Sequence, residues 1–135
     1  MVVLDCSAAI HMACRSDEGK MFKSLMLKGE TVISSKLLYP EASNVLWKYA
    51  RAGLVDARTA IGKAATVIAL VDEFYDVEPY YEEALSDAVR LKHPAYDLFY
   101  LLLAKRMGAT LFTADKRLTE LAEREGVDCI HEVTV

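Results

Sequence analysis

Four acidic residues stand at positions from which carboxylates can be brought together: Asp5, Glu41, Asp97 and Asp115. Asp5 and Asp115 each come directly after an apolar run of the length of a buried strand. Glu41 and Asp97 each lie at the expected start of a long helix, Glu41 directly after Pro40 and Asp97 three residues after Pro94. In a parallel α/β sheet, strand ends and the helix starts that follow them share one rim, so we expect all four carboxylates there.

Carboxylates gathered in this way repel one another, and each pair about 4 Å apart costs about 4 kcal/mol at an effective dielectric of about 20. A hard divalent cation removes this repulsion. Mg²⁺, with Mn²⁺ as the alternative, takes oxygen ligands and keeps several waters. The predicted reaction is metal-assisted hydrolysis of a phosphodiester, with one ion or with two roughly 3.5–4 Å apart. Taken singly, each acid also suits a helix N-terminus, so the prediction depends on their convergence.

A regular alternation of strands and helices must position these acids. β-Branched and apolar runs predict strands at 2–4, 31–33, 74–77, 110–113 and 127–130. Helical spacing of apolar residues predicts helices at about 7–14, 21–26, 35–52, 57–71, 82–91, 96–107 and 115–125. Ser7 is expected to cap the first helix and Asp56 the fourth. This order predicts an α/β fold with a parallel sheet of about four or five strands, covered by helices on both faces.

Size and composition fit one globular domain over residues 1–135, because 53% of the residues are hydrophobic. The net charge of −4 excludes a broadly basic surface, so any contact with nucleic acid must be local. Three cysteines without a CxxC pair favour a reducing cytoplasm. The N-terminus has no signal-peptide pattern and no apolar run reaches spanning length, so we expect a soluble cytoplasmic protein that does not bind membranes.

Four segments carry a family resemblance: residues 2–8 (VVLDCSA), 40–46 (PEASNVL), 96–104 (YDLFYLLLA) and 111–118 (LFTADKRL). In this order and spacing they resemble the PIN-domain ribonucleases, and most closely the VapC toxins of toxin–antitoxin pairs. The resemblance implies a PIN-like three-layer α/β/α sandwich. It also implies that the four acids bind metal, directly or through water, with Ser7 and Thr113 as hydroxyl groups beside the site. Cys6 and Leu98 depart from the usual Thr and small residue of the family, but neither removes a carboxylate.

The same resemblance implies a Mg²⁺-dependent endoribonuclease that cuts a selected RNA, such as transfer or ribosomal RNA. It further implies a VapB-like antitoxin and a homodimer. Residues 37–54 carry more apolar area than one helix face needs, which favours a partner groove, although a thick core explains it equally well. An amphipathic antitoxin helix would fill such a groove.

Basic residues near the acids are candidates for holding RNA phosphates: Lys48, Arg51, Arg106, Lys116 and Arg117. Ordinary solvated helix charge explains these residues equally well, with Lys116 and Arg117 favoured as ligands. The histidines His11, His93 and His131 form no HxxxH pair, so a zinc site is not expected.

Two other classes of function fit parts of the pattern. Aspartate-based phosphoryl-transfer domains also carry acids at strand ends, but they need a second acid beside the first, and Cys6-Ser7 supplies none. A PIN-like fold without activity would serve as a protein- or RNA-binding module, and the presence of all four carboxylates opposes this. The same metal chemistry serves DNA, so the preference for RNA comes from the resemblance alone.

Overall fold

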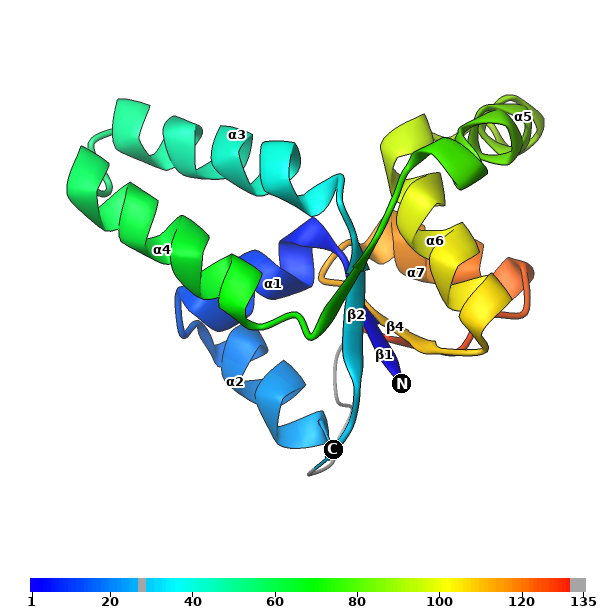
Figure 1. The fold of residues 1–135 in the computed structure, drawn as a ribbon, viewed down its shortest axis with the longest axis horizontal. Helices are drawn as coiled ribbons and strands as arrows, with labels where there is room; N and C mark the ends of the chain where they lie inside the picture. The colour runs from blue at the N-terminus through cyan, green and yellow to red at the C-terminus, as the bar shows by residue number, and fades with distance from the viewer. Residues whose placement is uncertain (27–28, 132–135) are drawn as a thin grey trace.

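The computed structural model describes residues 1–26 and 29–131 and contains a five-stranded parallel sheet between two layers of helices (Figure 1). The strands are β1 (Val2–Leu4), β2 (Val32–Ser35), β3 (Glu73–Tyr75), β4 (Thr110–Phe112) and β5 (Cys129–Ile130). The helices are α1 (Cys6–Ala13), α2 (Asp17–Leu25), α3 (Leu38–Arg51), α4 (Ala57–Ala69), α5 (Tyr81–Leu91), α6 (Ala95–Met107) and α7 (Lys116–Arg124), with a 3₁₀ turn η1 (Glu78–Tyr80) before α5. The predicted three-layer α/β/α fold is confirmed. No helix within the described ranges has the length and apolarity to cross a membrane.

The strand order across the sheet is β3-β2-β1-β4-β5. Val3 of the central strand pairs with Ile33 of β2 on one side and with Leu111 of β4 on the other. The chain therefore builds outward from β1 through β2 to β3, and then returns to the other side of β1 for β4 and β5. The side on which new strands are added thus changes between β1 and β4, which makes this pair the topological switch point of the sheet. Parallel sheets leave a crevice for ligands at the carboxyl ends of the two strands that flank a switch point.

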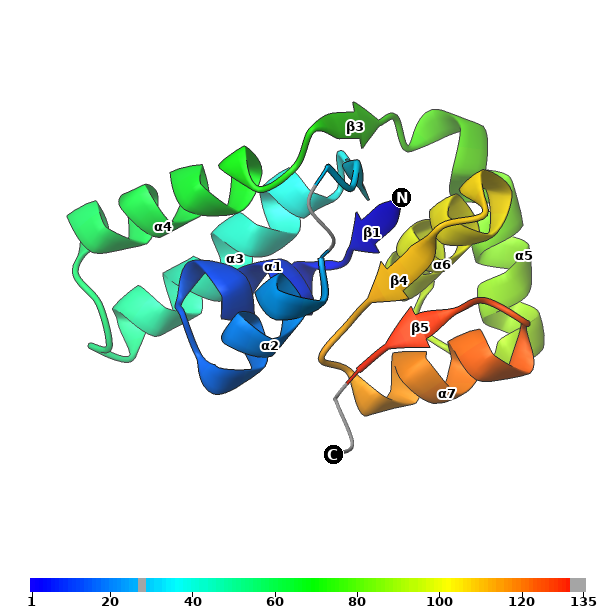
Figure 2. The same ribbon diagram turned by 90° about the horizontal axis from the view of Figure 1, so that it is seen from below.

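Successive strand residues face opposite sides of the sheet, which divides the core into two. Val2 and Leu4 face the layer of α1 to α4 and pack in a cluster with Phe22. Val3 faces the layer of α5 to α7 and packs in a cluster with Leu101. Figure 2 shows the same two layers from below. The crevice between β1 and β4 is therefore bordered by helices of both layers.

The first helix is capped by Asp5 rather than by Ser7, which corrects the prediction. The Asp5 backbone is extended, and its Oδ1 accepts the Ala8 amide at 2.8 Å. Ser7 lies inside the first turn, because the helix begins directly after the strand ends. Asp56 caps α4 as predicted, through the Thr59 amide at 2.7 Å.

Helix α2 begins at Asp17 rather than at residue 21, because Ser16 caps it by accepting the Gly19 amide at 3.1 Å. Ser16 Oγ also lies 2.7 Å from Nδ1 of His11 in α1. Gly19 packs so closely against α1 that a Cβ there would collide with the carbonyl group of His11. Both the backbone and the ring of His11 are thus fixed by the start of α2.

The outer strands β3 and β5 are shorter than the predicted ranges 74–77 and 127–130. Val77 is already in helical conformation, because it leads into the 3₁₀ turn η1. The Val127 amide donates to the carbonyl of Ala122 at the end of α7, so it is used in the helix terminus rather than in the sheet. A neighbouring helical element therefore limits each edge strand: η1 follows β3, and the end of α7 precedes β5.

Candidate functional site

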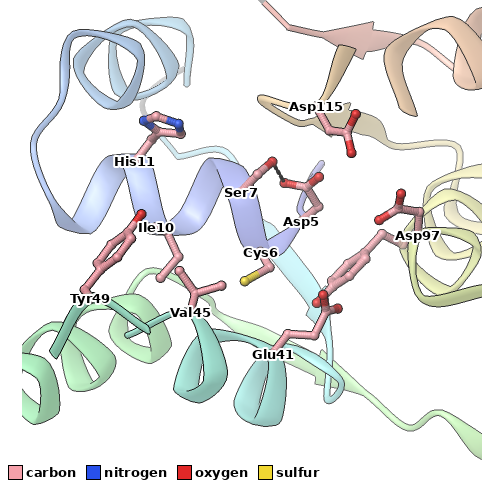
Figure 3. Close-up of a pocket in the computed structure, with 11 residues that line it drawn as sticks. Asp5, Cys6, Ser7, Ile10, His11, Glu41, Val45, Tyr49, Asp97 and Asp115 are labelled. Carbon is pink, nitrogen blue, oxygen red and sulfur yellow. Dashed lines mark hydrogen bonds between the residues drawn. The ribbon is translucent and has the colours of Figure 1, made fainter. Parts of the chain in front are cut away.

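All four predicted acids line one pocket of about 290 Å³ beyond the carboxyl ends of β1 and β4 (Figure 3). Asp5 directly follows β1 and caps α1, and Asp115 caps α7 just after β4. Glu41 reaches the pocket from the first turn of α3, and Asp97 reaches it from the first turn of α6. The site is thus built from both sides of the switch point and from both helical layers.

Asp5 is only 3% exposed, yet its carboxylate accepts from three donors. The Ala8 amide at 2.8 Å and the Ser7 hydroxyl at 2.7 Å donate to Oδ1, while the Thr113 hydroxyl donates to Oδ2. Ser7 Oγ in turn accepts the Ala114 amide at 2.9 Å. The two hydroxyls predicted beside the site therefore hold Asp5 in one orientation and join the end of β1 to the end of β4.

The pocket makes negative charge costly. Burial raises the pKa of Asp5 to about 7 despite its hydrogen bonds, and the Asp97 charge adds to the rise. Burial also raises the pKa of Glu41 and of Asp97, and each gains a further rise from a neighbouring acid. Beside them, burial and then the Glu41 charge raise the pKa of the Cys6 thiol to about 12. Cys6 is therefore protonated and is not a nucleophile.

Within the part of the chain that the structure describes, two buried side-chain atoms lack a hydrogen-bond partner, Glu41 Oε1 and the Tyr100 hydroxyl oxygen. Burial and then the Glu41 charge raise the pKa of Tyr100, and the nearby Tyr100 hydroxyl lowers the pKa of Glu41 against the effect of burial. An unsatisfied buried acceptor costs roughly 1–3 kcal/mol. A cation in the pocket would remove this cost.

The donor set fits a hard divalent ion, because carboxylate oxygens are the ligands that Mg²⁺ and Mn²⁺ prefer. The carboxylates of Asp97 and Asp115 point toward Asp5 across the pocket (Figure 3). Among residues 1–26 and 29–131, no group of three or more His, Cys, Asp or Glu side chains is arranged so that together they could hold a metal ion. Mg²⁺ in proteins keeps several waters and takes only one or two direct carboxylates, so an open acidic pocket meets its needs.

His93 belongs to the site, although the sequence provided no support for a role of this residue. Its Nε2 lies 2.7 Å from Asp97 Oδ2, and only 9% of the residue is exposed. The imidazole lowers the pKa of Asp97 against the effect of burial. His93 precedes Asp97 by four residues, across the proline that opens α6, and this spacing is the pattern that could have revealed the pair.

Basic side chains border the acidic pocket on the side of α7. Lys116 and Arg117 are exposed in its first turn, and the Arg117 charge lowers the pKa of Asp97. A second pocket, of about 570 Å³, is lined by His93, by the basic side chains of Lys92, Arg117 and Arg124, and by the acidic side chains of Glu120 and Glu123. Because His93 contacts Asp97, this pocket of mixed charge adjoins the acidic one.

Other predicted basic contacts lie elsewhere. Arg106 forms an ion pair with Glu83 at the far end of α6, about 13 Å from Asp97 by the helix rise. The prediction that Arg106 flanks the acids is therefore wrong, because α6 carries the two residues at opposite ends. Arg51 packs over an exposed tryptophan ring on its own helix. Lys48 is exposed on α3, three residues beyond pocket-lining Val45.

The chain is 29% identical over 125 residues to "Ribonuclease VapC3" of Pyrobaculum aerophilum, which is 88% of this chain and 92% of that protein. The crystal structure of PAE2754 from Pyrobaculum aerophilum matches with a TM-score of 0.72 and 30% identity, over 95% of this chain and 82% of that one.

Two more distant structures share the fold. VapC20 of Mycobacterium tuberculosis, a Sarcin-Ricin loop cleaving toxin, matches with a TM-score of 0.70 and 16% identity, over 99% and 100% of the two chains. VapBC-1 from nontypeable Haemophilus influenzae matches with a TM-score of 0.65 and 17% identity, over 96% and 97%. The family described as "PIN domain" matches residues 2–124. The chain with this acidic pocket at its sheet switch point belongs to the PIN-domain family.

Proposed function

We propose that this protein is a divalent-metal-dependent endoribonuclease and the toxin of a VapBC-type toxin–antitoxin pair. The observation that carries the proposal is the meeting of four carboxylates, one with an unsatisfied buried oxygen, in a single pocket. Membership of the PIN-domain family and the likeness to a protein named as a ribonuclease VapC support it. Mg²⁺ is the proposed ion and Mn²⁺ the alternative, in a single domain that spans residues 1–135.

The four acids would hold the metal, directly or through water. When bound, Mg²⁺ supplies Lewis-acid stabilisation of the phosphate charge and lowers the pKa of water beside it. The chain's own part is to keep the carboxylates in fixed positions. Ser7 and Thr113 hold Asp5, and His93 holds Asp97. Groups fixed before the reaction need no reorganisation during it, which is the basis of electrostatic catalysis.

RNA cleavage under controlled metal conditions tests the proposal. Wild type and Asp5→Asn would be incubated with transfer RNA and ribosomal RNA fragments in Mg²⁺, Mn²⁺ or EDTA, and the cuts mapped on a sequencing gel. We expect discrete cuts with metal, and none with EDTA or with Asp5→Asn, since asparagine keeps the shape and removes the charge. Asp128→Asn, at an exposed position outside the pocket, is the matched control and keeps full activity.

Two outcomes would contradict the proposal. Cuts in DNA alone would overturn the assignment to RNA. A wild type that is inert on both polymers with every metal, and that shows no Mg²⁺ binding in calorimetry, would indicate the PIN-like binding module instead.

His93 is proposed to act through Asp97. Replacing it with alanine is expected to weaken Mg²⁺ binding by roughly 10–100-fold, the usual cost of losing a side chain that orients a metal ligand. His93→Gln keeps a donor near the same position and is expected to retain most of the affinity. Calorimetric titration of Mg²⁺ measures both, and an alanine variant with wild-type affinity would refute the positioning role.

Phosphate contacts must be local, because the chain carries a net charge of −4. Exposed Lys116 and Arg117 beside the acids, with Lys92 and Arg124 of the adjoining pocket, supply such a border. Lys48 stands on the opposite side, on α3. We propose that these side chains lead the RNA backbone across the acids.

The antitoxin would dock in a groove of about 580 Å³ between α1, α2 and α4, which Met12, Met26 and Leu70 line with apolar atoms. Lys20 and Lys23 line the same groove, which suits an amphipathic helix with acidic flanks. The partner groove that the sequence predicted over residues 37–54 has only partial support on α3. Buried Leu38 and Leu46 of α3 fill the core, whereas Tyr39, Trp47 and Leu54 are exposed.

A homodimer is also part of the proposal. Tyr81, Leu85 and Val89 lie at four-residue spacing on α5, and all three are more than half exposed. Tyr96, at the start of α6, is exposed as well. An apolar stripe of this kind on a surface helix is typical of a protein interface.

A further inference from the structure

The acidic pocket has a second half that metal chemistry does not use. Away from the acids, the pocket is lined by Ile10 and His11 of α1 and by Val45 and Tyr49 of α3 (Figure 3). Glu41 and Tyr49 stand on the same face of α3, eight residues and about 12 Å apart by the helix rise. The pocket therefore continues from the carboxylates into a slot of different chemistry.

The slot combines apolar walls with two ring systems. Ile10 and Val45 supply aliphatic surface, and Tyr49 reaches from α3 toward Ile10 and His11 (Figure 3). Burial is the main cause that raises the pKa of Tyr49, so its hydroxyl is neutral and able to donate a hydrogen bond. None of the four side chains carries a permanent charge.

His11 is held in a fixed position at the rim of this slot. Its Nδ1 lies 2.7 Å from Ser16 Oγ, and Gly19 packs directly against its backbone. Among the described contacts, none uses Nε2, which leaves that nitrogen for a ligand. The slot thus offers flat surfaces for stacking, with one hydroxyl and one ring nitrogen for polar contacts.

A nucleobase matches this chemistry. It is flat and uncharged, it stacks on aromatic rings, and its edge carries both donors and acceptors. A phosphate does not fit, because the slot lacks a cation and adjoins the acids. Since the slot opens onto the carboxylates, the base it takes belongs to a nucleotide next to the cleaved phosphate.

We propose that Tyr49 and His11 bind an unstacked nucleobase beside the scissile phosphate, so that the protein cuts at single-stranded or flipped-out nucleotides and selects among bases there. The proposal rests on the proposed ribonuclease function. A base inside a duplex cannot enter a concave pocket without leaving its stack, and so substrate selection follows from the shape of the slot.

Binding of uncharged nucleosides tests the slot without metal, phosphate or cleavage. Adenosine, guanosine, cytidine and uridine would be titrated separately into the protein in EDTA, with the ring resonances of Tyr49 and His11 followed by NMR. We expect one or two of the four to shift both rings. Tyr49→Leu is expected to weaken that binding by about 5- to 150-fold, the range for losing one base-stacking aromatic.

Trp47→Leu is the matched control, because Trp47 is an aromatic on the same helix that is 54% exposed and does not line the pocket. It is expected to leave nucleoside binding unchanged. Tyr49→Phe keeps the ring and the packing, so it separates stacking from the hydroxyl contact and guards against a folding defect. His11→Ala tests the second ring in the same titration.

The cleavage arm uses an RNA library with random bases around a common sequence. Tyr49→Leu and His11→Ala are expected to change the base preference beside the cut, and Trp47→Leu is not. Nucleosides that leave both rings unshifted, or identical cut preferences in all variants, would overturn the proposal. Ring shifts caused only by an apolar peptide would assign the slot to a protein partner instead. Failure of the ribonuclease proposal is distinguishable, because it leaves the nucleoside titration intact.

Discussion

Replacing Asp5 with asparagine is expected to stabilise the metal-free protein by roughly 4 kcal/mol at pH 8, even though it removes activity. Burial raises the pKa of Asp5 from the 3.8 of an exposed aspartate to about 7. Each pKa unit corresponds to about 1.4 kcal/mol of unfolding free energy. The folded protein therefore carries the cost of an ionised, buried carboxylate that asparagine does not have.

The sign of the pH dependence follows from the raised pKa. Below about pH 4 the Asp5 carboxyl is protonated in both states and contributes no penalty. Between about pH 4 and pH 7 the unfolded chain releases the proton first, so the folded state loses stability as the pH rises. Above about pH 7 the full penalty is present. The advantage of Asp5→Asn should thus be near zero at pH 4 and reach its maximum by pH 8.

Urea unfolding in EDTA at a series of pH values measures this difference, with Asp128→Asn as the control that follows wild type. Mg²⁺ at about 100 times its dissociation constant should add about 2.7 kcal/mol to wild type and less to Asp5→Asn. A gap between the two proteins that does not change with pH would show that the Asp5 charge is not its cause.

Replacing Asp97 with asparagine is expected to lower kcat/KM for RNA cleavage by roughly 10²–10³-fold, the usual cost of removing one preorganised electrostatic group. The asparagine oxygen can still accept the His93 hydrogen bond that now holds Asp97 Oδ2. The fold is therefore expected to survive, and near-wild-type unfolding would show that the loss is chemical.

A double-mutant cycle then separates the effect of Asp97 on kcat/KM from the effect of His93. If His93 acts only by positioning Asp97, His93→Ala should have little further effect on kcat/KM once Asp97 is asparagine. Additive losses from the two changes would contradict that dependence. Asp128→Asn again serves as the control of equal charge change at an exposed position.

The sequence was sufficient for the parts of the site that depend on backbone topology. Apolar runs that end at Asp5 and just before Asp115 predict strand ends, and a parallel sheet places such ends at one rim. The same reasoning brought Glu41 and Asp97 to that rim, where the structure has them. Convergence follows from strand direction, which alternation of strands and helices already determines.

Details that depend on packing between distant segments were not predictable in this way. Arg106 pairs with Glu83, from α5, and no periodicity in α6 could reveal that partner. The ring of His11 faces the pocket because α2 fixes it through Ser16. The error at the first helix has a local cause, because Asp5 and Ser7, two positions apart, can both cap a helix and the end of the strand decides between them.

The strand order has a consequence for how the site arises during synthesis. Asp5 and Glu41 come from the segment that builds β1, β2 and β3, whereas Asp97 and Asp115 come from the segment that returns to the far side of β1. A growing chain that has left the ribosome only as far as β3 has half of the acids and no β4 to complete the crevice. The full set of carboxylates exists only after Asp115 has emerged, so the nascent chain has an incomplete acidic pocket for most of its translation.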